Sequence, residues 1–91
     1  MNNGAYRLVM AASAERGLRR LPEKVAAAVV EFMTGALVET PRTLGHPLQR
    51  ELRGLWAARR GAYQVGYAID DDARLVSVLR LDHRVDVYRP H

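Results

Sequence analysis

The sequence predicts an α+β fold in which a two-helix hairpin packs on one face of a small, mainly antiparallel sheet, in the order β-α-α-β-β-β. The first observation is a helical period of apolar residues in the first half of the chain. The second is a set of three strand-like segments in the second half, joined by short turns. The third is size, because 91 residues with 48% hydrophobic and 26% charged residues suit one small core. We expect a single domain over residues 1–91, with flexible tails at residues 1–4 and 89–91.

The first half of the chain predicts one strand and two helices. Residues 6–10 form the strand, and Ser13 is placed to cap a short helix that ends near Leu21. Pro22 interrupts this helix and suits the first turn of the next one. The second helix is the clearest signal, since its apolar residues recur with a helical period: Val25, Ala28, Val29, Phe32, Ala36 and Leu37. Two helices joined by a tight turn form a hairpin whose apolar side needs a sheet to cover it.

The second half predicts a loop and then three strands. Residues 38–47 contain two prolines and a glycine and are expected to form a loop. A strand follows around residues 55–60, and residues 63–69 alternate between large apolar and smaller or polar side chains with a period of two. After an acidic turn, residues 75–81 form a mostly apolar strand, expected near the middle of the sheet. Their hairpin-length connections make these three strands antiparallel, and a short strand or coil follows at residues 85–88.

Composition excludes several classes of protein. The chain has no cysteine, so it holds no disulfide, no cysteine-ligated metal and no cysteine nucleophile. The acidic run at residues 70–72 reads as a solvated turn rather than a metal site, because consecutive turn residues rarely point to one centre. We expect no metal and no cofactor. No signal pattern and no apolar run of membrane-spanning length is present, so we expect a cytoplasmic protein with no membrane partner.

The charge balance favours an anionic partner. Fourteen Lys and Arg residues against ten Asp and Glu give a net charge of +4, and Lys24 is the only lysine. Arginine forms bidentate hydrogen bonds with phosphate and carboxylate groups and stacks on flat rings. GC-rich coding also raises arginine content, so the excess of arginine alone does not indicate a function. A positive chain fits nucleic acid or an acidic protein.

The residue pattern near the C-terminus suggests chemistry on RNA. His83 follows a buried strand and precedes Arg84 and, five residues on, Tyr88. RNA is cut without metal when its 2′-hydroxyl attacks the adjacent phosphate, which requires a base, cations on the developing charge and an acid at the leaving oxygen. His83 can move the proton, and arginines can hold the phosphate. A half-buried capping histidine fits the same spacing equally well.

Two further pairs of residues are ambiguous from sequence. Arg59 and Arg60 are adjacent in a strand, so they should face opposite ways, and only one should join Arg84. Among the aromatic residues we expect Tyr67 in the core, whereas Tyr63 and Tyr88 suit either a core or a base-stacking role. His46 lies in the predicted loop, where simple exposure is the favoured interpretation.

Two segments resemble the RelE/ParE superfamily of bacterial type II toxins, with the actinobacterial RelE-like branch most similar. The stretch from Pro47 reads PLQRELRGLWAARRGAYQVGYAID, and the stretch from Leu81 reads LDHRVDVY. Their order and spacing match that superfamily over residues 6–89. The resemblance implies the same helical hairpin on an antiparallel sheet. It also implies a toxin neutralised by a RelB-like antitoxin with an acidic toxin-binding segment, operator DNA being bound only through that complex.

The resemblance also implies site residues. The catalytic set it implies is His83, Arg84, Tyr88 and Arg59. The RNA-binding set it implies is Arg60, Gln64, Tyr63 and Arg53. The chain departs from the pattern at Gln64, where many relatives carry a catalytic arginine, and at Leu55 and Ala57, where the best-known RelE enzymes carry lysines.

Three functions follow from this resemblance. The leading expectation is a metal-independent, ribosome-dependent endoribonuclease that cuts mRNA in the A site and stops translation. A ParE-like, non-enzymatic poison of DNA gyrase is the alternative that the missing lysines and Gln64 suit. The third is a catalytically weak homologue that acts mainly in a repressor complex with its antitoxin.

Overall fold

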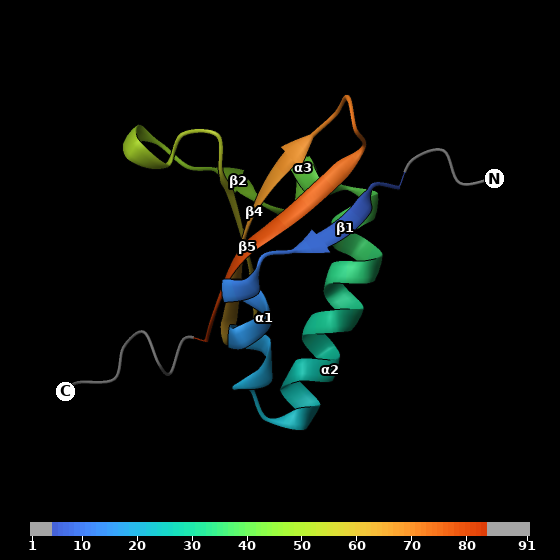
Figure 1. The fold of residues 1–91 in the computed structure, drawn as a ribbon, viewed down its shortest axis with the longest axis vertical. Helices are drawn as coiled ribbons and strands as arrows, with labels where there is room; N and C mark the ends of the chain where they lie inside the picture. Colours follow the sequence, from blue (N-terminus) through green and yellow to red (C-terminus); the bar gives the residue numbers. More distant parts are fainter. Residues whose placement is uncertain (1–4, 84–91) are drawn as a thin grey trace.

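A computed structural model of the chain describes residues 5–83, so the expectations for Arg84, Tyr88 and the strand at residues 85–88 lie outside the described residues. Five strands form one sheet in the order β1-β5-β4-β3-β2 (Figure 1). The elements along the chain are β1 (Arg7–Met10), α1 (Ala12–Arg19), α2 (Glu23–Phe32), a π-helical turn (Met33–Leu37), α3 (Pro41–Leu44), β2 (His46–Pro47), a 3₁₀ turn (Arg50–Leu52), β3 (Trp56–Arg60), β4 (Tyr63–Asp70) and β5 (Leu75–His83). The predicted order of one strand, two helices and three further strands is confirmed.

The three long strands form the antiparallel meander that their short connections predict. β3 pairs with β4 and β4 with β5, both antiparallel, with a bulge between Gly66 and Tyr67. The turn at Gly61 has a φ of 61°, which glycine adopts without strain. β5 has a neighbour on each side, as expected from its apolar sequence.

β1 lies parallel to β5, with Arg7 opposite Leu75 and Met10 opposite Val78. The helical hairpin leads from β1 at one edge of the sheet to β2 at the other, and β3 and β4 then lead back to β5; together they form the long connection that a parallel pairing requires. This non-local pairing decides the strand order that the sequence left open.

The helices cover one face of the sheet, as the sequence predicted (Figure 1). The core between them contains Val29, Phe32, Met33 and Leu37 from the helical side. The sheet contributes Ala58, Tyr63, Val65, Tyr67, Val76, Val78 and Leu81. Tyr67 is fully buried, so its expected place in the core is confirmed. Burying this apolar surface is the main source of stability in a chain without disulfides.

Ser13 does not cap α1. Ala11 is the N-cap residue, and the Ser13 hydroxyl instead donates a hydrogen bond of 2.7 Å to the Leu79 carbonyl of β5. β1 ends opposite Val78, so the edge of β5 beyond that residue lacks a strand partner on this side. The hydroxyl satisfies one of the carbonyls that this leaves open.

The predicted loop at residues 38–47 contains regular structure. Pro41 begins α3, where a proline suits the first turn of a helix. His46 and Pro47 form β2, opposite Ala57 and Trp56 respectively. Pro47 is tolerated because β2 is an edge strand and a missing N–H costs little there. In this segment proline and glycine therefore lie at the ends of α3 and β2, and they do not indicate a segment without regular structure.

The segment between β2 and β3, yellow-green in Figure 1, extends away from the sheet. It includes Arg53, which is exposed, and Gly54 with a φ of 97°. Within residues 5–83, no helix has the length and apolar character needed to cross a membrane.

Candidate functional site

Strand register divides the candidate residues between the two faces of the sheet. We call the face that α1 and α2 do not cover the open face. Arg59 lies opposite Gln64, and Gln64 lies opposite Asp82, so the three form one row across β3, β4 and β5. The next residues along each strand, such as Val65 and Leu81, point into the core. The row therefore belongs to the open face.

A second row lies beside the first. His46 is opposite Ala57, Ala57 is opposite Gly66, and Gly66 is opposite Arg80. Ala57 and Gly66 have small or no side chains, so the surface between His46 at one end of the row and Arg80 at the other carries no bulky group. His46 is a diagonal cross-strand neighbour of Arg59 on this face, and the Cα atoms of such pairs are typically about 7–8 Å apart. The open face thus presents imidazole, guanidinium, amide and carboxylate groups over a shallow surface.

Arg60, Tyr63 and His83 lie on the other face. The Arg60 guanidinium carbon is 5.4 Å from the centre of the Phe32 ring. Tyr63 packs edge-to-face on Phe32 with ring centres 6.4 Å apart, and His83 lies opposite Tyr63. The expectation that Arg59 and Arg60 face opposite ways is confirmed. His83 is half-buried, and the pleat separates it from Arg59 and Gln64.

Tyr63 does not offer the stacking surface that the sequence suggested. Its side chain is 7% exposed and belongs to the core cluster. Burial raises the pKa of its hydroxyl above the ordinary value. The structure therefore favours the core role for Tyr63 over base stacking, because the ring packs against Phe32 of α2, and its contact with RNA stays a prediction.

Tyr67 has a structural role. Its hydroxyl donates a buried hydrogen bond of 2.6 Å to the Pro41 carbonyl, which fixes α3 against the sheet. Burial raises the pKa of Tyr67 to about 12, so this hydroxyl stays protonated and keeps donating. It takes no part in the open face.

The acidic turn is also structural. Both guanidinium nitrogens of Arg42 donate to Asp71, at 2.9 and 2.7 Å, and the Tyr6 hydroxyl donates to the same carboxylate at 2.5 Å. These bonds lower the pKa of Asp71 to about 2, the hydrogen bond from Arg42 being the largest cause. Asp70 accepts a hydrogen bond from the Ala73 amide. Asp71 therefore connects this turn to α3 and to the residue before β1.

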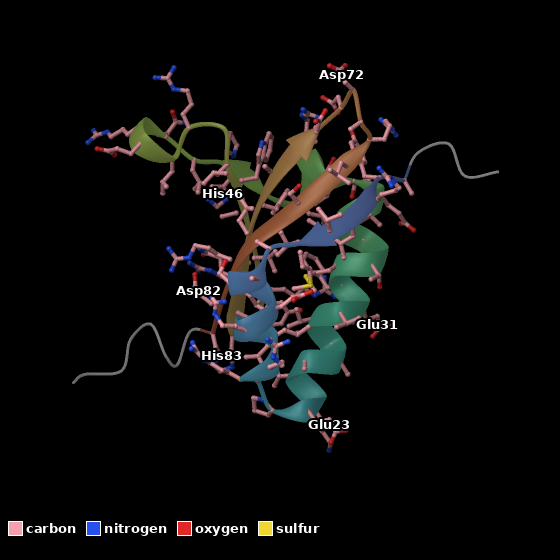
Figure 2. All side chains as sticks on the ribbon, viewed as in Figure 1. Glu23, Glu31, His46, Asp72, Asp82 and His83 are labelled. Atoms are coloured by element: carbon pink, nitrogen blue, oxygen red, sulfur yellow. The ribbon has the colours of Figure 1, made fainter. Side chains whose placement is uncertain are left out.

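His46 lies on the open face, where the sequence did not place it. The loop prediction hid its pairing with Ala57, which places it on the same face as Arg59. Figure 2 shows His46 between Asp72, at one end of the sheet, and Asp82 and His83, toward the other. The signal available in the sequence was the short polar stretch before Pro47, which can pair as an edge strand.

A groove lies on the helix-covered side, away from the open face. It has a volume of about 630 Å³ and is lined by Phe32, Glu31 and Glu39 together with Arg60 and Tyr63 of the β3–β4 hairpin. Its mixture of aromatic and acidic side chains differs from the open face. Arg60 contributes to this groove rather than to the row of Arg59.

Comparisons with known proteins agree with this architecture. A family model described as the ParE toxin of type II toxin–antitoxin system, parDE, matches residues 8–88. Toxin RelG of Mycobacterium tuberculosis is 48% identical over 84 residues, which is 92% of this chain and 97% of that protein. Toxin RelE of the same organism is 49% identical over 84 residues, which is 92% of this chain and 87% of that protein.

Solved structures show the same fold. The crystal structure of the toxin–antitoxin complex RelBE2 from Mycobacterium tuberculosis matches with a TM-score of 0.86 at 46% identity, covering 88% of this chain and 99% of that chain. The intact Escherichia coli RelBE toxin–antitoxin complex matches with a TM-score of 0.70 at 19% identity, covering 87% of this chain and 96% of that chain. The second likeness concerns the fold alone. The predicted helical hairpin on a mainly antiparallel sheet is confirmed.

Proposed function

The chain belongs to the RelE/ParE superfamily of type II toxins, and from this premise we propose that it is a ribosome-dependent endoribonuclease that cleaves mRNA in the A site. The observation that carries the proposal is the open-face row of Arg59 and Gln64, with His46 beside it. A guanidinium and an amide on one rigid surface can hold a phosphate while an imidazole lies within the same region.

The proposed chemistry is attack of the RNA 2′-hydroxyl on the adjacent phosphate, with release of the 5′-oxygen. Arg59 and Arg84 stabilise the charge that develops on the phosphate, and Gln64 donates a hydrogen bond to it. Tyr88 orients the substrate or stacks on its base. A histidine takes the proton from the 2′-hydroxyl, and a proton is delivered to the leaving 5′-oxygen. The two candidates for this transfer are His46, which shares the face of Arg59, and His83, which the sequence suggested but which lies on the other face. Arg53, on the exposed segment before β3, contacts the RNA backbone.

A large partner is part of this proposal. The open face is shallow, and its polar groups lie in two rows with no deep pocket between them, so we infer that the RNA is positioned by something other than the toxin. The ribosome supplies that positioning and places the protein in the cytoplasm. We also propose that a cognate antitoxin with an acidic segment neutralises the toxin, because the chain carries a net charge of +4 and the RelBE2 match is to a toxin–antitoxin complex.

The test is a reconstituted translation reaction with a defined mRNA, in which new RNA 5′ ends are mapped with and without ribosomes. Arg59→Ala is expected to lower cleavage about a hundredfold, since it removes charge from the phosphate. Arg60→Ala is the matched control, because the adjacent arginine lies on the other face and should keep most activity. Cleavage that is equal in both variants would contradict the assignment of the open face.

The two histidines are separated by the same assay. We expect loss of cleavage in either His83→Ala or His46→Ala, and the sensitive residue is the one that moves the proton. If both variants and Tyr88→Ala retain full cleavage, the proton-transfer assignment fails.

A gyrase poison is the second candidate function. The observation in its favour is Gln64, which lacks the charge that phosphate chemistry favours. Induction in a bacterial host separates the two: a ribonuclease halts translation, whereas a gyrase poison causes DNA damage and filamentation. No mRNA cleavage together with DNA damage would replace the first proposal by the second.

A further inference from the structure

A basic depression lies where α1 runs along the end of β5, beyond the residues assigned to cleavage. It has a volume of about 390 Å³, and three arginines line it: Arg16, Arg20 and Arg80. We propose that this depression binds the phosphodiester backbone of RNA. The inference rests on the proposed function in one respect, namely that RNA crosses the open face.

The depression is built on rigid elements. α1 lies close against β5 at Gly17, where an added Cβ would be 2.8 Å from the Leu81 carbonyl oxygen. The Ser13 hydrogen bond to Leu79 holds the same two elements together. Arg20 is the C-cap residue of α1 and follows Arg16 by four positions, so the two side chains lie on the same side of the helix end. Arginines from two fixed elements therefore line one small volume.

The charge of the lining favours an anion. Three guanidinium groups face one carboxylate, that of Asp82. Arg80 pairs with Asp82 only at 3.4 Å, and its side chain is 74% exposed, which leaves most of its donors available. Within residues 5–83, Arg16 and Arg20 form no ion pair. A bound phosphate would relieve the repulsion between these cations and accept forked hydrogen bonds from them.

The position of the depression favours RNA over a peptide. Arg80 and Asp82 belong to the two open-face rows that contain His46, Arg59 and Gln64. A strand of RNA on that face reaches the depression without leaving the surface. The lining offers little apolar surface to anchor a peptide, in contrast to the groove beside Phe32 and Tyr63. The depression would thus hold phosphates flanking the reacting one.

The test uses the full-length toxin and a double variant, Arg16→Gln with Arg20→Gln. The matched control is Arg19→Gln, which removes an arginine from the same helix but does not line the depression. Binding is measured over a range of salt concentrations with two probes. One is a single-stranded RNA whose 2′-hydroxyls are methylated so that it cannot be cut, and the other is ribosomes without mRNA.

We expect the double variant to bind about tenfold more weakly, and the slope of log affinity against log salt to fall by about 1.4 for the single-stranded probe, about 0.7 for each lost contact. Arg19→Gln should change the slope far less. If the double variant loses affinity for the single-stranded RNA, the depression binds mRNA. If it loses affinity for ribosomes alone, the depression binds ribosomal RNA. Both outcomes support a phosphodiester site.

Unchanged affinity and slope on both probes would overturn the inference, as would weaker binding of an acidic peptide with RNA binding intact. Circular dichroism checks folding, and the single variant Arg20→Gln, at the end of α1, repeats the test if the double variant misfolds. Wild-type protein that binds RNA through this depression but never cleaves it would refute the proposed ribonuclease and leave the inference standing.

Discussion

Arg59 and Arg60 are neighbours in the chain, yet the pleat of β3 gives them different surroundings. Arg60 extends over the Phe32 ring, whereas Arg59 lies in a row with Gln64 and Asp82 on the open face. Of these two arginines, Arg59 shares the face of Gln64, so we expect Arg59 rather than Arg60 to contact a phosphate held there. Because side chains alternate between the two faces of a strand, the position of an arginine in β3 decides whether it belongs to the site, although both residues are of the same type.

Gln64 is where this chain departs most from the pattern of its superfamily, and the open face predicts the consequence. Gln64→Arg should raise the rate of ribosome-dependent cleavage about fivefold to tenfold, because a hydrogen bond from a charged donor is worth about 1 kcal/mol more than one from an amide. The measurement is the rate of appearance of new mRNA ends at saturating ribosomes.

Gln49→Arg is the control for this prediction, since it adds the same charge at an exposed position before the 3₁₀ turn. Equal rates for wild type and Gln64→Arg would show that the row of Arg59 and Gln64 does not hold the reacting phosphate. A rise in both variants would indicate a general effect of charge instead.

At the scale of elements, the contact between α1 and β5 depends on the absence of a side chain at Gly17. An added Cβ would lie 2.8 Å from the Leu81 carbonyl oxygen, which belongs to the backbone of a central strand and cannot move aside cheaply. Gly35 in the π-helical turn has no atom within 4 Å of such a Cβ. The two glycines form a matched pair.

Gly17→Ala is expected to lower the free energy of unfolding by about 1–3 kcal/mol, despite the better helix propensity of alanine, because overpacking forces the helix away from the strand. Gly35→Ala should leave stability unchanged or raise it by up to about 1 kcal/mol. Urea unfolding followed by the fluorescence of Trp56 measures both. Equal stabilities for the two variants would contradict the close packing of α1 on β5.

At the scale of the whole molecule, three distant segments meet at Asp71. Arg42 of α3 and Tyr6 before β1 both bond to this carboxylate in the turn between β4 and β5. The guanidinium of Arg74 lies 4.2 Å above the Tyr6 ring at the same place. Residues separated by 65 and 29 positions in the sequence are thus held together at one end of the sheet.

The hydrogen bonds to Asp71 predict how stability depends on pH. The pKa of Asp71 falls from 3.8 to about 2 on folding, so its contribution is fully present above about pH 4 and is lost as the pH falls toward 2. Asp71→Asn should unfold at lower urea than wild type at about pH 5, with a smaller difference at about pH 2. Asp72→Asn, in the same turn, is the control. A difference that persists at low pH would show that the ion pair is not its source.

The sequence predicted most of the local structure because local structure follows local rules. The alternation in residues 63–69 predicted β4, and the apolar period predicted α2. The predictions for Ser13 and for residues 38–47 were wrong because both depend on partners outside the local sequence. Ser13 bonds to Leu79, and Tyr67 bonds to the Pro41 carbonyl and so holds α3 against the sheet. A capping preference or a run of proline and glycine carries no information on such partners.

The sequence by itself determined the fold class, the superfamily and the set of residue types available for chemistry, because periodicity, turn residues and motif spacing are written along the chain. The tertiary structure alone decided that β1 runs parallel to β5, that Tyr63 is buried under α2, and that His46 joins Arg59 while His83 faces the other way. It also decided that Arg16 and Arg20 meet Arg80 in one depression. Each of these depends on which strand edges pair and in what register. Pairing is set by burial summed over the whole core, and shifting a strand by one residue would exchange its two faces.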